Sequence, residues 1–155
     1  MNTYEKLLAS LVEGGVQFMT VGALACAFNG LVRATLDVDI VIARTPENVR
    51  TLLGVLSRHG SGAARELQWE DFSDEPGAVR IIEEFPIDVF VRIGGFTYEE
   101  LLPWRREYLA QYQGQAVAIP YVSAEGLIAI KSSSSREQDR LDIAMLRRLG
   151  EEEQS

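Results

Sequence analysis

The sequence predicts one α+β domain, α/β-like in its first half, in which a mixed central β-sheet is flanked by helices. Two observations predict this fold class. Helical and strand-like patterns alternate early, strand-like segments then cluster, and helical patterns close the chain. The chain has 155 residues, of which 46% are hydrophobic, and this is enough to bury one core. We therefore expect a single domain over residues 1–150 and a frayed acidic tail over residues 151–155.

The first half of the chain contains the alternating elements. In order, we expect a helix over 4–12, a strand over 16–21, a helix over 23–28, a strand over 36–43 and a helix from 46 onward. Asn2 and Glu5 are placed like a capping box for the first helix. Thr45 is placed as the N-cap of the helix expected from residue 46 onward, with Pro46 at the first helical position.

The second half begins with a polar, glycine-containing stretch over residues 60–78. It predicts an irregular loop with a short strand at 66–69. We then expect strands over 79–82 and 87–93, a short helix over 98–102, a hairpin over 108–119, and helices over 123–130 and 137–149.

Composition and charge exclude several classes of protein. The apolar runs are shorter than the roughly 20 residues that span a bilayer, so we expect no membrane contact. The net charge of −8 disfavours broad binding to nucleic acid phosphates. Cys26 is the single cysteine and cannot form an internal disulfide, and no secretion signal is visible, so we expect a cytoplasmic protein.

Two aspartates, Asp37 and Asp39, interrupt an apolar strand pattern. Residues two apart in a strand point to the same side, so these two carboxylates share one face. Crowded carboxylates on an apolar strand repel each other and lose hydration, which a bridging divalent cation relieves. Ligands made only of oxygen suit Mg²⁺ or Mn²⁺. The pair therefore indicates a metal site.

Asp88 interrupts a second apolar strand pattern in the same way. If its strand lies beside the Asp37 strand, three carboxylates converge and can hold two Mg²⁺ ions, as in phosphoryl or nucleotidyl transfer. The alternative is that Asp88 ends an edge strand and faces water.

A phosphate-binding role is indicated for the segment before the aspartates. Gly22 and Ala23 open a helix directly after a strand, where backbone N–H groups can approach a phosphate. Arg33 and Thr35 precede Asp37 and can orient a phosphate, although Arg33 can equally be the salt-bridge partner of an aspartate.

Lys131 shares a helix face with apolar residues, so its stem points inward and its ammonium needs an anion. That anion is a triphosphate or an aspartate, and the alternative is a lysine that reaches solvent at a helix end. Asp139 and Asp142 share a helix face and can hold Lys131 or Arg136 in place without binding metal.

These motifs together resemble the nucleotidyltransferase superfamily of the DNA polymerase β-like fold. Gly30, Arg33, Thr35, Asp37 and Asp39 form a Gly-x-x-Arg-x-Thr-x-Asp-x-Asp pattern similar to minimal nucleotidyltransferases of the abortive-phage-infection toxin type. A later motif of that type, a lysine followed by Arg, Asp and Asp, is matched by Lys131, Arg136, Asp139 and Asp142. Ala23 departs from the pattern, because the family often has Gly or Ser after the first glycine.

The resemblance implies a nucleotidyltransferase fold and transfer of NMP from an NTP such as ATP to a hydroxyl acceptor. Mg²⁺ or Mn²⁺ would be the cofactor, and Asp37, Asp39 and Asp88 would be the catalytic metal ligands. The acceptor stays open between a small molecule, a protein and a tRNA, and a cognate partner protein of the toxin–antitoxin kind is implied only by the likeness. Two alternatives remain, a catalytically degenerate domain that binds a nucleotide or a partner protein, and a metal-dependent phosphohydrolase.

Overall fold

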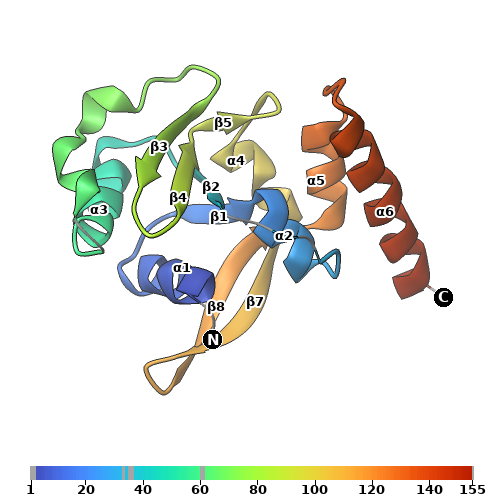
Figure 1. Cartoon of the computed structure of the whole chain (residues 1–155), viewed down its shortest axis with the longest axis horizontal. Coiled ribbons are helices and arrows are strands. Elements are labelled where there is room, and N and C mark those ends of the chain that lie inside the picture. Colours follow the sequence, from blue (N-terminus) through green and yellow to red (C-terminus); the bar gives the residue numbers. More distant parts are fainter. Residues whose placement is uncertain (1–2, 33, 35–36, 60–61, 155) are drawn as a thin grey trace.

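The computed structural model describes residues 3–32, 34, 37–59 and 62–154. Within these residues one mixed sheet has the strand order β3-β4-β2-β1-β8-β7 (Figure 1). Its strands are β1 (Phe18–Val21), β2 (Val38–Ile42), β3 (Ala78–Ile82), β4 (Pro86–Phe90), β7 (Arg105–Tyr112) and β8 (Gln115–Val122). The β1–β8 and β2–β4 pairs are parallel, and the other three pairs are antiparallel. The mixed sheet with flanking helices confirms the predicted fold class.

Helices cover both faces of this sheet. They are α1 (Thr3–Glu13), α2 (Gly22–Phe28), α3 (Pro46–Leu56), α4 (Tyr98–Leu101), α5 (Ala124–Lys131) and α6 (Glu137–Gln154). The predicted N-cap Thr45 is confirmed, because it accepts a hydrogen bond from the Asn48 backbone N–H. Ser123, where a helix was expected to begin, caps α5 in the same way by accepting one from Gly126. Asn2 lies outside the described residues. No helix in the described part of the chain combines the length and the apolar character needed to cross a bilayer.

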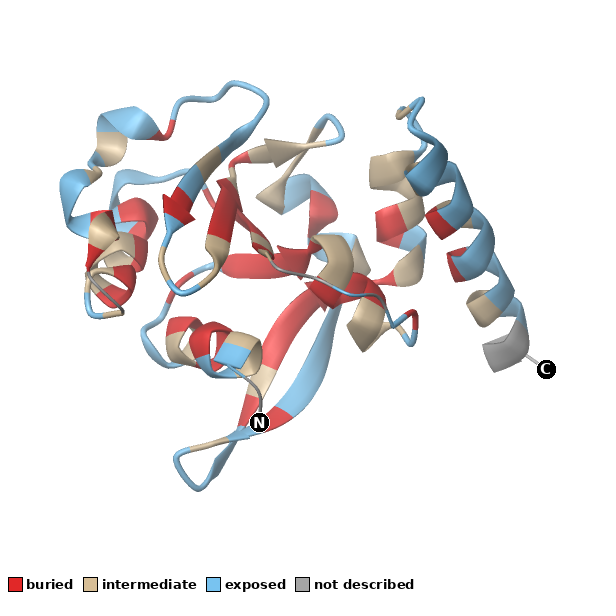
Figure 2. Cartoon of the chain, viewed as in Figure 1, coloured by how far each residue is buried: buried red, intermediate tan, exposed pale blue. Residues whose placement is uncertain are grey.

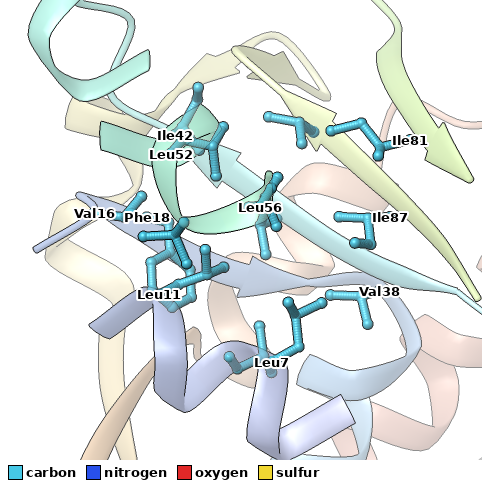
Figure 3. Packing of buried hydrophobic residues seen from close by; sticks show 14 of the residues in the cluster. Leu7, Leu11, Val16, Phe18, Val38, Ile42, Leu52, Leu56, Ile81 and Ile87 are labelled. Carbon is cyan, nitrogen blue, oxygen red and sulfur yellow. The ribbon is translucent and has the colours of Figure 1, made fainter. Parts of the chain in front are cut away.

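The alternation of side chains along β2 divides the core into two layers. Val38, Ile40 and Ile42 lie on the face covered by α1 and α3, in one cluster with residues such as Leu11 and Leu52 (Figure 3). Asp39 and Val41 alternate with them and therefore point to the opposite face. Figure 2 shows that the central strands are buried along most of their length.

The second layer lies on that opposite face, under α2, α5 and α6. Its members include Met19, Val21, Cys26, Val41 and Leu146. Cys26 is fully buried, which agrees with the packing role expected of a small apolar residue. The face that carries Asp39 is thus apolar around its centre, and a charged group at its edge is partly desolvated.

Several predicted elements have different bounds in the structure. The strand predicted at 66–69 is wrong, because two short 3₁₀ helices, Ala63–Glu66 and Trp69–Asp71, occupy this region. The Gln68 backbone N–H donates to the Asp71 carboxylate, a local contact that favours a turn. The last helix extends through Gln154, into the stretch that we expected to be a frayed tail.

The strand predicted over 87–93 is also interrupted. β4 ends at Phe90, and β5 (Arg92–Ile93) pairs with β6 (Phe96–Thr97) in a separate small hairpin. Gly94 and Gly95 both have positive φ, the conformation that a two-residue hairpin turn requires. The long hairpin of β7 and β8 extends beyond the predicted range at both ends.

Candidate active site

Asp39 and Asp88 lie directly opposite each other on neighbouring parallel strands. The β2–β4 register pairs Asp39 with Asp88, so both side chains project from the same face of the sheet. The strand adjacency on which the predicted carboxylate cluster depends is therefore present. The Asp88 side chain is only 9% exposed, and Asp39 is partly buried. Sequence patterns located both carboxylates on strands, and the sheet pairing brings them together.

Asp37 immediately precedes β2 and joins this pair through an arginine. Arg80 of β3 donates from Nε to Asp88 Oδ1 at 2.8 Å and from Nη2 to Asp88 Oδ2 at 2.9 Å. Its Nη2 also lies 3.3 Å from Asp37 Oδ2. One guanidinium thus contacts two of the three carboxylates predicted to bind metal.

The electrostatics of the site are dominated by crowded negative charge. Burial, as the largest cause, and the neighbouring carboxylates of Asp88 and Asp37 together raise the pKa of Asp39 to about 7. The positive charge of Arg80 opposes this shift and does not cancel it. A carboxyl with a pKa near neutrality, in contact with another carboxyl, is typical of a site that accepts a cation.

Gly22 is required by the shape of this site. Its φ of +68° is a conformation that residues with a Cβ rarely adopt. A Cβ built at this position would overlap Oδ2 of Asp39 and lie 2.9 Å from its Cβ and Cγ. The glycine that sequence analysis assigned to phosphate binding therefore also leaves room for the Asp39 carboxylate. Ala23 follows it in the first turn of α2 and is partly exposed.

The donor set fits a hard divalent cation in its chemistry. Two adjoining carboxylates, with a third held close by Arg80, supply the oxygen ligands that Mg²⁺ or Mn²⁺ prefers. Among the described residues, however, no three His, Cys, Asp or Glu side chains are already arranged to hold a metal ion. The three predicted ligands would have to close around the cation, and Arg80 lies among them.

Lys131 is held by two carboxylates of α6. Its Nζ donates to Asp139 Oδ1 at 3.0 Å and lies 3.2 Å from Asp142 Oδ2. Burial by itself lowers the pKa of Lys131, but hydrogen bonds to these carboxylates outweigh it and hold the pKa above its ordinary value. Of the two anions expected for this lysine, the structure places the aspartates next to it. Arg136 is exposed, and its backbone N–H donates to Ser134.

Sequence analysis missed Arg80, and two of its predicted residues cannot be placed. Arg33 and Thr35 lie outside the described residues. Arg80 stands alone as a charged residue among apolar ones in β3, the same kind of signal that marked Asp88 in β4. This sequence pattern does not show which strands pair, and only the β3–β4 register places Arg80 opposite Asp88.

A separate cavity of about 320 Å³ lies on the other side of the sheet, beside α1. Its lining includes Lys6, Leu7, His59, Phe85 and Tyr112, and none of the three aspartates. Leu7 belongs to the core layer under α1 and α3, whereas Asp39 and Asp88 face away from that layer. This cavity is therefore distinct from the carboxylate site.

Comparison with known proteins supports the fold. No protein-family model matches the chain, and no curated protein matches it. The chain is similar to the crystal structure of a putative nucleotidyltransferase from Thermotoga maritima, with a TM-score of 0.54 and 18% sequence identity. The match covers 96% of this chain and 90% of that one. At this level of identity the likeness shows the fold alone, so the chain has a nucleotidyltransferase fold.

Proposed function

We propose that this chain is a metal-dependent nucleotidyltransferase that transfers NMP from an NTP to a hydroxyl acceptor and releases pyrophosphate. The observation that carries the proposal is the pairing of Asp39 with Asp88 on adjacent strands. The nucleotidyltransferase fold supports it, because it makes this chemistry the first one to test.

Each site residue has a role in this proposal. Asp37, Asp39 and Asp88 would hold Mg²⁺ or Mn²⁺, and the metal ion would neutralise charge on the triphosphate and on the attacking oxygen. Asp88 accepts the proton of the acceptor hydroxyl, which attacks the α-phosphorus in line with the leaving pyrophosphate. Gly22 and Ala23, at the start of α2, present backbone N–H groups to the phosphates, and Arg33 and Thr35 orient them.

In this proposal Lys131 would neutralise the triphosphate, and Arg136, Asp139 and Asp142 would support it. The ion pairs of Lys131 with α6 favour a role in joining α5 to α6. A direct contact with the nucleotide would require Lys131 to leave at least one of these carboxylates.

The test uses labelled NTPs, Mg²⁺ and a cell extract, and it asks which molecule becomes labelled. We expect Asp37→Asn and Asp39→Asn to abolish labelling while circular dichroism shows an intact fold. Asp74→Asn is the matched control, because Asp74 is an exposed aspartate that pairs with Arg92. Full turnover in the Asp39→Asn protein would exclude the proposed metal role.

A second candidate, a domain that binds a nucleotide or partner protein without catalysis, is favoured by one observation. Arg80 already supplies a positive charge to Asp88, as it would in a protein that no longer needs a metal there. Calorimetry with Mg²⁺ and each NTP separates the candidates, because binding without pyrophosphate release supports the second one. Release of orthophosphate would indicate a phosphohydrolase instead.

A further inference from the structure

We propose that the Arg80 guanidinium competes with the divalent metal ion for the carboxylates of Asp88 and Asp37, so that metal binding displaces Arg80. This inference rests on the proposed function, because it assumes that the aspartates bind metal. According to this inference, Arg80 lowers the affinity of the substrate-free protein for the metal ion.

The sheet itself delivers Arg80 to this position. β3 pairs with β4 in antiparallel register, and Arg80 lies directly opposite Asp88. Side chains that face each other in such a pair are neighbours on one face of the sheet. The contact is therefore built into the strand pairing and does not depend on a loop.

The guanidinium occupies both oxygens of Asp88. The two hydrogen bonds of 2.8 and 2.9 Å form the bidentate arrangement in which arginine binds a carboxylate most strongly. The 3.3 Å contact to Asp37 brings the same cation to a second predicted metal ligand. A metal ion bound to these oxygens would lie against a fixed positive charge, so one of the two cations must leave.

Arg80 is the partner that can move. Its side chain is 52% exposed, whereas that of Asp88 is 9% exposed and surrounded by strands. β3 is an edge strand, so a long side chain on it has solvent to swing into. Asp88 lies between Ile87 and Val89, two core residues whose packing fixes the backbone of β4.

The first experiment measures Mn²⁺ affinity by the electron paramagnetic resonance signal of the free ion. We expect Arg80→Met to bind Mn²⁺ about tenfold more tightly than the unmodified chain, within the range usual for two coupled ligands. Arg92→Met is the matched control, because it removes the same charge from a different salt bridge, the one with Asp74. Equal tightening in both variants would mean a general effect of charge and would overturn the proposal.

The second experiment follows Arg80 in the unmodified chain. The Arg80 Nε–H resonance is recorded by nuclear magnetic resonance during titration with Mg²⁺ and is assigned from its absence in Arg80→Lys or Arg80→Met. We expect it to shift from the value of a carboxylate-bound guanidinium to that of a free one. An unchanged resonance at saturating Mg²⁺ would overturn the proposal.

The outcomes also separate this inference from the proposed function. If the unmodified chain and Arg80→Met bind Mn²⁺ equally well, competition is excluded and the metal-dependent function stands. If neither binds Mn²⁺ and Asp39→Asn behaves identically, both the inference and the metal-dependent function fail.

Discussion

Asp39 and Asp88 occupy opposing positions on two parallel strands, and both side chains project from the same face of the sheet. The two residues are far apart in sequence, and each is surrounded along its own strand by apolar residues. The pairing concentrates negative charge at the edge of a buried layer. Together with burial, this relationship raises the pKa of Asp39.

The pH dependence of stability should report this crowding. In the unfolded chain the Asp39 pKa returns to about 3.8, whereas in the folded protein it is about 7. Between these values the folded state holds a proton that the unfolded state has lost, so stability falls as pH rises and the full penalty is present above pH 7. In EDTA, Asp39→Asn should be more stable relative to the unmodified chain at pH 8 than at pH 4, by up to about 4 kcal/mol.

Urea denaturation of both proteins at the two pH values checks this expectation. Adding Mg²⁺ at pH 8 should stabilise the unmodified chain and leave Asp39→Asn almost unchanged. Parallel pH profiles in EDTA would show that Asp39 is not crowded by its neighbours.

Gly22→Ala should damage the site more than the fold. The positive φ alone costs about 1–2 kcal/mol for a residue with a Cβ, and the added methyl group must push Asp39 aside. We therefore expect loss of Mn²⁺ binding and of nucleotidyl transfer in a protein that still unfolds cooperatively in urea.

Gly54→Ala is the matched control for this change. Gly54 is helical, and a Cβ there would meet nothing within 4 Å, so alanine should stabilise α3 by about 0.5–1 kcal/mol. Unaltered metal binding in Gly22→Ala would contradict the close packing of Gly22 on Asp39.

Lys131→Met should destabilise the contact between α5 and α6. The substitution leaves the carboxylate of Asp142, which is 3% exposed, without its cation and should cost about 3 kcal/mol in urea denaturation. Lys6→Met on the exposed side of α1 should change stability by no more than about 0.5 kcal/mol. A large rise in KM for NTP with unchanged stability would instead indicate contact with the triphosphate.

The ion pair between Lys131 and Asp139 predicts that the stability of the fold changes at acidic pH. Burial favours a higher pKa for Asp139, but hydrogen bonds from Ser134 and Lys131 outweigh it and hold the pKa below its ordinary value. This stabilisation is present above the pKa of the unfolded chain and is lost as pH falls through the lower, folded value. The stability difference between the unmodified chain and Lys131→Met should therefore shrink in acid, and a constant difference would argue against the ion pair.

Thr45→Ala tests the N-cap of α3. The Thr45 hydroxyl accepts a hydrogen bond of 3.1 Å from the Asn48 backbone N–H, and its loss should cost about 1 kcal/mol. Thr51→Ala in the same helix should be neutral or slightly stabilising, because alanine has the higher helix propensity. Equal effects of the two substitutions on the urea midpoint would show that the cap contributes nothing specific.

Local signals in the sequence predicted most of the helices and strands, and they predicted that Asp39 and Asp88 lie on strands. Thr45, Pro46 and Ser123 predicted helix starts because capping involves residues only a few positions apart. The apolar neighbours of Asp39 and Asp88 predicted strands with a carboxylate on each. Residues 66–69 were misassigned because a local hydrogen bond between Gln68 and Asp71 favoured a turn.

Only the tertiary structure decided how these pieces meet. The β2–β4 register places Asp39 opposite Asp88, and the β3–β4 register adds Arg80, which no local pattern related to either aspartate. The anion next to Lys131 was likewise left open by the sequence and was decided by the packing of α6 on α5. Capping and periodicity depend on neighbours along the chain, whereas strand pairing and helix packing depend on contacts between distant segments, and those contacts form the proposed site.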